Sequence, residues 1–240
     1  YLEINLSKHI VQITYDNSAL NPRKAWDHDS TFVCREHRHY ELGDKQDHEL
    51  LQSMIENKRI KNIRLFTSLE CVGPQAEYMR RGLNYQLFLQ NINTFLEVVP
   101  SGYLSFMTTY NVLTVPYFKD FLKLIVELRQ KWGDRILLDI AHLKEPPHWT
   151  MNILPKKFGV YMVDCVDFMK GNNCFTETEI NKMERVRDYF YNDSHAITDE
   201  YRKNARKDFG KFFPEYDRRS NLNFAKTFPE LQEFLQDCVR

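Results

Sequence analysis

The sequence predicts an α/β fold built on parallel strands, and residues 62–111 carry most of that prediction. Two short apolar runs, residues 62–67 and 103–109, have the length and composition of buried strands. Between them, apolar residues recur every three or four positions, as on one face of an amphipathic helix; they are Tyr85, Phe88, Leu89, Ile92, Phe95 and Leu96. A strand, a helix and a second strand in this order predict a right-handed crossover between two parallel strands.

The remaining elements follow in chain order. Residues 1–20 hold two alternating apolar stretches, which are typical of strands, and residues 49–57 have the pattern of a short helix. Residues 116–133 predict a longer helix, because proline is favoured in a first turn and glycine just after a last one. Residues 135–140 form a third apolar run, and we expect one more short strand at residues 150–154.

Helical patterns dominate the end of the chain. Residues 158–240 are therefore predicted to be a helical C-terminal extension of a first domain formed by residues 1–157. Thr176 begins a capping-box pattern, and residues 199–213 carry a run of charges of the kind that usually marks a solvated helix face. Within the first domain, residues 16–48 have no clear period and are expected to form an irregular insertion.

The overall composition excludes several classes of protein. The 240 residues include 33 acidic side chains and 33 Lys plus Arg, so the formal net charge is zero. We therefore expect no broad nucleic-acid surface, although a local basic patch is compatible with this balance. No apolar run approaches the ~20 residues that span a bilayer. The five cysteines are odd in number and scattered, which predicts reduced thiols in a cytoplasmic or other reducing compartment.

Polar side chains follow the predicted parallel strands where each strand ends. Ser68 and Glu70 come after the first strand, and Thr109 and Asn111 close the second. In open and barrel α/β sheets, ligands bind at the carboxyl edge of the strands. We therefore expect a binding site at this edge.

The irregular insertion contains a group of histidines with one cysteine. His28, Cys34, His37 and His39 are weak candidates for a zinc site, because imidazole and thiolate are the ligands that zinc prefers. Their spacing matches no standard zinc motif, and solvated histidines are common in loops. A surface segment without a metal is the alternative interpretation.

Four segments together resemble the radical S-adenosylmethionine proteins. RLFTSLECVGPQAEYMRRG, residues 64–82, resembles the family's fourth strand and the loop after it, and SFMTTYNVLTVPYFKDFL, residues 105–122, looks like its fifth strand. RILLDIAHLKEPPHWTMNILPKKF, residues 135–158, is similar to the sixth-strand region. EYDRRSNLNFAKTFPEL, residues 215–231, resembles the closing segment of the branch that carries a twitch domain. The resemblance extends over roughly residues 60–231.

This resemblance implies a partial (β/α) barrel that binds S-adenosylmethionine at the carboxyl ends of its strands. Ser68 and Glu70 stand where the family places groups near the methionine or ribose of the cofactor, and Arg80 stands where an arginine contacts its carboxylate. Asn111, with Thr109 beside it, stands where a polar group of the fifth strand faces the cofactor. The alternative is that Ser68 caps a turn and Arg80 pairs with a surface acid.

The chain departs from the family in its cysteines. Radical chemistry requires a four-iron, four-sulfur cluster, which three thiolates of a CxxxCxxC loop hold in this family, and no such triplet is present. The chain opens without Met on a strand-like stretch, so we expect an upstream part that supplies the cluster. The expected function is that of the C-terminal part of a radical enzyme acting on an unidentified substrate. The alternative is a catalytically inactive scaffold that binds a protein partner.

Overall fold

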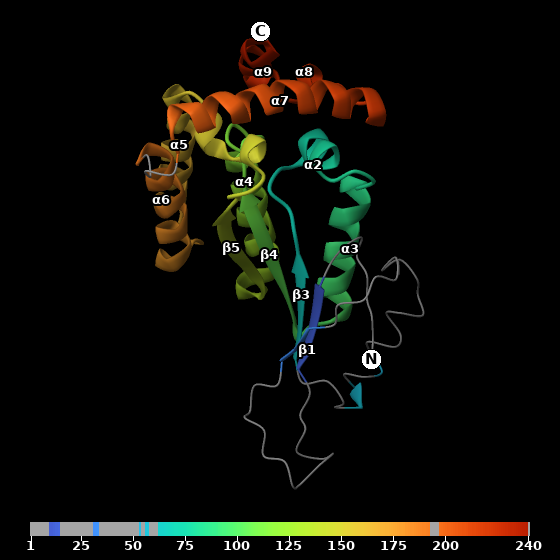
Figure 1. Ribbon diagram of the computed structural model, residues 1–240. Coiled ribbons are helices and arrows are strands. Elements are labelled where there is room, and N and C mark those ends of the chain that lie inside the picture. Colours follow the sequence, from blue (N-terminus) through green and yellow to red (C-terminus); the bar gives the residue numbers. More distant parts are fainter. Residues whose placement is uncertain are drawn as a thin grey trace, which may run out of the picture. The chain divides into compact units, whose positions relative to one another are not determined.

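The computed structural model describes residues 10–14, 31–33, 53, 56, 57, 62–192 and 197–239 (Figure 1). The chain divides into two compact units, which are described separately. The sheet unit comprises Tyr1–Ser68, Leu83–Met107 and Leu128–Leu138; the helical unit comprises Leu69–Gly82, Thr108–Glu127 and Asp139–Arg240. The predicted metal ligands His28, Cys34, His37 and His39 lie outside the described residues.

A five-stranded sheet has the order β2-β1-β3-β4-β5. Strands β3 (Asn62–Thr67), β4 (Gly102–Tyr110) and β5 (Ile136–His142) form its parallel part, with Leu65 opposite Leu104. This confirms the predicted α/β class and the parallel crossover. β1 (Ile10–Thr14) pairs antiparallel with β3, and β2 (Thr31–Val33) pairs antiparallel with β1. The partial barrel stays a prediction.

The crossover helix of the sheet unit is α3 (Tyr85–Val98), and its apolar face is buried as the sequence predicts. Asn84 caps the helix, because its side-chain oxygen accepts a hydrogen bond from the backbone N–H of Leu87 at 3.0 Å. At the other end, the Arg135 guanidinium donates to the carbonyls of Val99 (2.6 Å) and Gly102 (2.7 Å). These bonds fix the turn that leads from α3 into β4.

Helix α4 (Phe118–Trp132) connects β4 to β5 and confirms the helix predicted over residues 116–133. A 3-10 turn, Gly133–Arg135, follows it directly. Among the described residues, no helix is both long enough and apolar enough to cross a membrane.

The helical unit contains α2 (Gly73–Met79), α5 (Gly159–Lys170), α6 (Glu177–Tyr191), α7 (Asp199–Ser220), α8 (Phe224–Thr227) and α9 (Gln232–Val239). Three short 3-10 turns, Pro147–Trp149, Met151–Ile153 and Lys156–Phe158, precede α5. The predicted capping box is present at Thr176. The strand predicted at residues 150–154 is wrong, because this segment forms a 3-10 turn. The domain division at residue 157 stays a prediction.

A cluster of aromatic rings forms the core of the helical unit. Tyr78 from α2 packs edge-on against Phe228, with the ring centroids 5.0 Å apart, and Phe213 of α7 lies 5.0 Å from Phe224. The Tyr78 hydroxyl donates to Asp217 at 2.7 Å. Helix α2 is thereby joined to the segment that runs from α7 into α8, so residues 64–82 and 215–231, two of the segments that carry the family resemblance, are in contact.

Gly210 of α7 lies directly against the backbone at the end of α9. A Cβ atom at this position would lie 2.3 Å from the carbonyl oxygen of Cys238 and 3.0 Å from the backbone nitrogen of Val239. Backbone atoms cannot rotate away as a side chain can. The absence of a side chain at Gly210 therefore allows the end of α9 to lie against α7.

Gly210→Ala is expected to destabilise the protein by up to about 2 kcal/mol, because overpacking costs about 1–3 kcal/mol and the helix propensity of alanine offsets roughly 1 kcal/mol of it. Urea unfolding followed by circular dichroism measures the change. Gly171→Ala is the matched control, since its added methyl would lie 3.4 Å from the Asp167 carbonyl, in ordinary contact. Equal stability of the two variants would show that α9 does not depend on Gly210.

Candidate functional site

Glu70 and Arg80, two of the residues that the sequence predicts for the site, form an ion pair in the helical unit. Glu70 lies in the loop before α2, and Arg80 is the first residue after that helix. Nη2 of Arg80 donates to Oε1 of Glu70 at 2.5 Å. Glu70 is only 4% exposed, whereas the Arg80 side chain is 31% exposed. The short helix α2 therefore brings the two charges together across ten positions of sequence.

The second strand end also contributes to this pair. The backbone N–H of Thr109 donates to Oε1 of Glu70 at 3.3 Å. Thr109 acts through its main chain at this contact. Glu70 thus links the loop before α2 to the end of β4.

Burial dominates the electrostatics of Glu70. Desolvation raises the pKa of its carboxyl group, and the Arg80 charge with the two hydrogen bonds opposes the rise without cancelling it. Nη2 of Arg80 donates a hydrogen bond to Glu70, whereas Nε of Arg80 is buried and has no hydrogen-bond partner. A buried donor without a partner costs about 1–3 kcal/mol, which an anionic acceptor such as a carboxylate or phosphate would recover.

Asn111 is buried and makes a turn of its own. Its side-chain oxygen accepts from the backbone N–H of Leu113 at 3.0 Å, and its amide donates to the Thr109 carbonyl at 3.0 Å. The hydroxyl of Thr114 completes the turn, because it accepts from the Asn111 backbone N–H at 2.8 Å. These bonds stop β4 and hold the backbone beside Thr109.

Ser68 is half-buried and is the last residue of the first segment of the sheet unit. Within the helical unit, the structure brings Glu70, Arg80 and Thr109 into direct contact and joins Asn111 to Thr109. The assignment of these residues to a bound cofactor stays a prediction.

Polar groups at the end of β5 meet residues that sequence reasoning did not single out. His142 stacks on the ring of Tyr189 from α6, with the centroids 4.2 Å apart, and its Nε2 is buried without a partner. Burial lowers the pKa of His142, and Lys144 adds to this effect. Asn152 donates to the Tyr189 carbonyl at 3.2 Å. No local sequence pattern identifies Tyr189 or Asn152 as neighbours of His142, because these contacts join segments that are far apart in the chain.

The cysteines in the described part of the chain form no disulfide, and the surroundings of the two buried ones do not suit metal binding. Cys71 and Cys165 are buried, and desolvation raises the pKa of Cys165 to about 12 and that of Cys71 well above its usual range. Such thiols resist the deprotonation that a metal ligand requires. Within the described part of the chain, no group of three or more His, Cys, Asp or Glu side chains could hold a metal ion.

Comparisons of this chain with protein-family models, with curated proteins and with solved structures found no match.

Glu70→Gln is expected to gain stability relative to the native chain as the pH rises from 4 to 7. The folded state has the higher pKa, so protonation of Glu70 favours folding. That contribution is complete below the unfolded value near 4.5 and is lost as the pH rises through the raised folded value. The native chain therefore loses this contribution progressively as the pH rises, whereas the neutral glutamine of the variant has no proton to lose.

Urea unfolding at both pH values measures the difference in the free energy of unfolding between the two chains. Glu127→Gln removes an exposed carboxylate of α4 and reports the effect of losing one charge alone. If Glu70→Gln instead lost stability relative to the native chain as the pH rose from 4 to 7, the attraction of Arg80 would outweigh the burial of Glu70.

Proposed function

We propose that this chain is the C-terminal part of a radical S-adenosylmethionine protein, and that Glu70, Arg80, Thr109 and Asn111 belong to its cofactor pocket. The observation that carries the proposal is the buried Nε of Arg80, which has no hydrogen-bond partner. An arginine at this place in the family motif would bind the carboxylate of the cofactor. The parallel strands β3, β4 and β5 agree with the α/β part of the family fold.

In this proposal Arg80 and Glu70 contact the cofactor, and Asn111 positions the backbone beside them. Arg80 donates from Nε to the cofactor carboxylate while its Nη2 remains on Glu70, so the ion pair fixes the plane of the guanidinium. Oε1 of Glu70 takes the contacts with Arg80 and Thr109. We assign Oε2 of Glu70 to the amino group or a ribose hydroxyl of the cofactor. Asn111 positions the Thr109 backbone through its turn.

The iron–sulfur cluster of the family does not fit the described thiols. A cluster of this type would supply the electron that cleaves the cofactor, and thiolates must hold it. The buried Cys71 and Cys165 have raised pKa values and are poor ligands. We therefore assign no reaction step to this part of the chain; a part that holds the cluster would have to be supplied from elsewhere.

A second candidate is a catalytically inactive scaffold that binds a protein partner. The observation that favours it is the turn of Asn111, in which the side-chain oxygen and amide both bond to the protein's own backbone. Glu70 likewise has partners within the chain. A polar strand end that satisfies itself in this way can persist for structural reasons after cofactor binding is lost.

Calorimetric titration of the full chain with S-adenosylmethionine and with methylthioadenosine, which lacks the amino-acid carboxylate, tests the cofactor proposal. We expect Arg80→Ala to weaken S-adenosylmethionine binding by about tenfold or more, since a charged hydrogen bond contributes about 1.5–3 kcal/mol. Binding of methylthioadenosine should change little, because Arg80 has no carboxylate to contact there.

Arg81→Ala is the matched control: Arg81 is the next residue and is exposed. It should leave both affinities unchanged. Equal losses for the two ligands would refute the carboxylate contact. A native chain that binds neither ligand, but copurifies with a stoichiometric protein partner, would favour the scaffold.

A further inference from the structure

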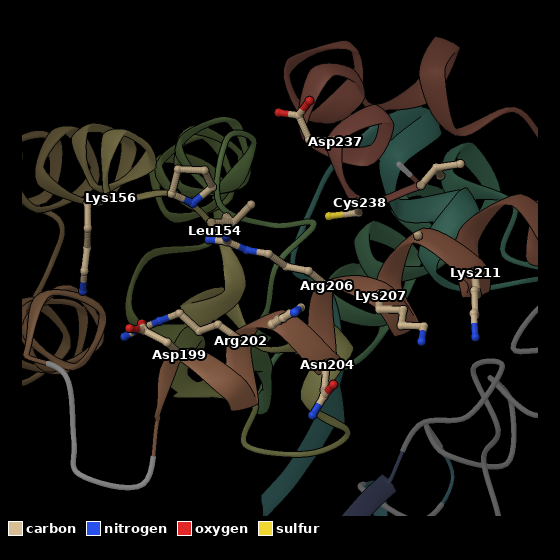
Figure 2. Close-up of a pocket in the computed structure, with 14 residues that line it drawn as sticks. Leu154, Lys156, Asp199, Arg202, Asn204, Arg206, Lys207, Lys211, Asp237 and Cys238 are labelled. Carbon is tan, nitrogen blue, oxygen red and sulfur yellow. The ribbon is translucent and has the colours of Figure 1, made fainter.

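A basic pocket lies in the helical unit, and it is independent of the Glu70–Arg80 pair. Helix α7, the end of α9 and the segment before α5 line a cavity of about 1080 Å³ (Figure 2). Six cationic side chains line it: Lys156, Arg202, Lys203, Arg206, Lys207 and Lys211. Asp199 and Asp237 are the carboxylates in the lining, which leaves an excess of four positive charges in a chain whose formal net charge is zero.

Three of the six cations have partners within the protein. Arg206 donates from Nε to the Ile153 carbonyl at 2.7 Å, and Lys156 donates to the Phe190 carbonyl at 2.5 Å. Arg202 pairs with Asp199 at 3.1 Å. These contacts fix positive charge in the wall of the pocket. The positive potential there is therefore a property of the folded chain.

The other three cations, Lys203, Lys207 and Lys211, are exposed and make no hydrogen bond or ion pair within the described part of the chain. They are spaced four residues apart on α7, so each follows the last by about 6 Å along one side of the helix. Figure 2 shows Lys207 and Lys211 extending from the same side of α7. The pocket thus combines a row of three lysine ammonium groups that can bind a ligand with cationic side chains that are held by the protein.

We propose that this pocket binds the phosphate backbone of a single-stranded nucleic acid. Successive phosphates in a strand are separated by a sugar, and a row of lysines at about 6 Å intervals suits such a repeat better than the adjoining phosphates of a pyrophosphate. Lysine ammonium groups bind phosphate as rotatable point charges. Asn204 adds a neutral amide to the lining, which can donate to a phosphate or a base edge.

Other polyanions fit the pocket less well. Carboxylates of an acidic peptide are best bound by the planar fork of arginine, whereas the cations of the lining that have no partner within the described part of the chain are all lysines. A membrane surface is flat, so it would contact the exposed lysines but not the half-buried Arg202 and Arg206. The available groups are lysines in a groove, which is the arrangement that follows a flexible phosphate chain.

Fluorescence anisotropy with a labelled oligothymidylate of about 15 nucleotides tests this proposal on the full chain, at salt concentrations from about 50 to 200 mM. The variant Lys203→Gln/Lys207→Gln/Lys211→Gln should weaken binding by about tenfold or more. It should also reduce the slope of log K against log salt by about 2, because each phosphate contact on a single strand contributes about 0.7.

Lys123→Gln/Lys170→Gln/Lys226→Gln is a control matched in charge: it removes three lysines outside the pocket, two of them from ion pairs with Asp120 and Glu184. It should bind within about twofold of the native chain, and unfolding midpoints should show that both variants are folded. Equal losses in the two variants would overturn the proposal, as would the absence of binding by the native chain. Displacement of the oligonucleotide by polyglutamate or anionic vesicles at the same charge concentration would overturn the assignment to nucleic acid.

Discussion

The helical unit depends on the carboxylate of Asp217. One oxygen accepts the Tyr78 hydroxyl at 2.7 Å, and the other accepts the backbone N–H of Phe224 at 2.7 Å. Two distant segments are thereby tied together at the edge of an aromatic cluster, where the loss of either partner would leave a poorly hydrated polar group. Burial and this carboxylate both raise the pKa of Tyr78, so the hydroxyl remains a donor. Arg80 closely follows the helix that Tyr78 anchors.

Because α2 is anchored, the ion pair of Glu70 and Arg80 is held in one geometry. Burying a charged pair costs solvation that its attraction repays only in part, so such a pair is weak evidence for stability. The raised pKa of Glu70 reflects that cost. The buried, unpartnered Nε of Arg80 adds a further cost. A ligand that bonds to Nε of Arg80 would offset part of both costs, the desolvation of Glu70 and the missing hydrogen bond of Arg80.

Local sequence patterns were enough to predict the elements whose stability is local. The apolar spacing on α3 and the capping box at Thr176 both depend on residues within a few turns of helix, and both predictions are confirmed. The strand prediction for residues 150–154 was wrong because a short apolar run is compatible with either a strand or a helical turn. Tertiary contacts decide the matter: Thr150 bonds back to the Pro147 carbonyl, and Asn152 bonds to Tyr189 of α6.

The sequence by itself determined the α/β class, the main helices and the position of Glu70 just after a strand end, whereas Arg80 entered the predicted site through the family resemblance. It also contained the four-residue spacing of the lysines on α7, but that spacing alone predicts only a solvated face. Tertiary structure decided that the Thr109 backbone meets Glu70 and that Gly210 allows the end of α9 to lie against α7 beside the lysines. Periodicity records the contacts within one helix or strand, whereas a pocket requires segments far apart in the chain to meet.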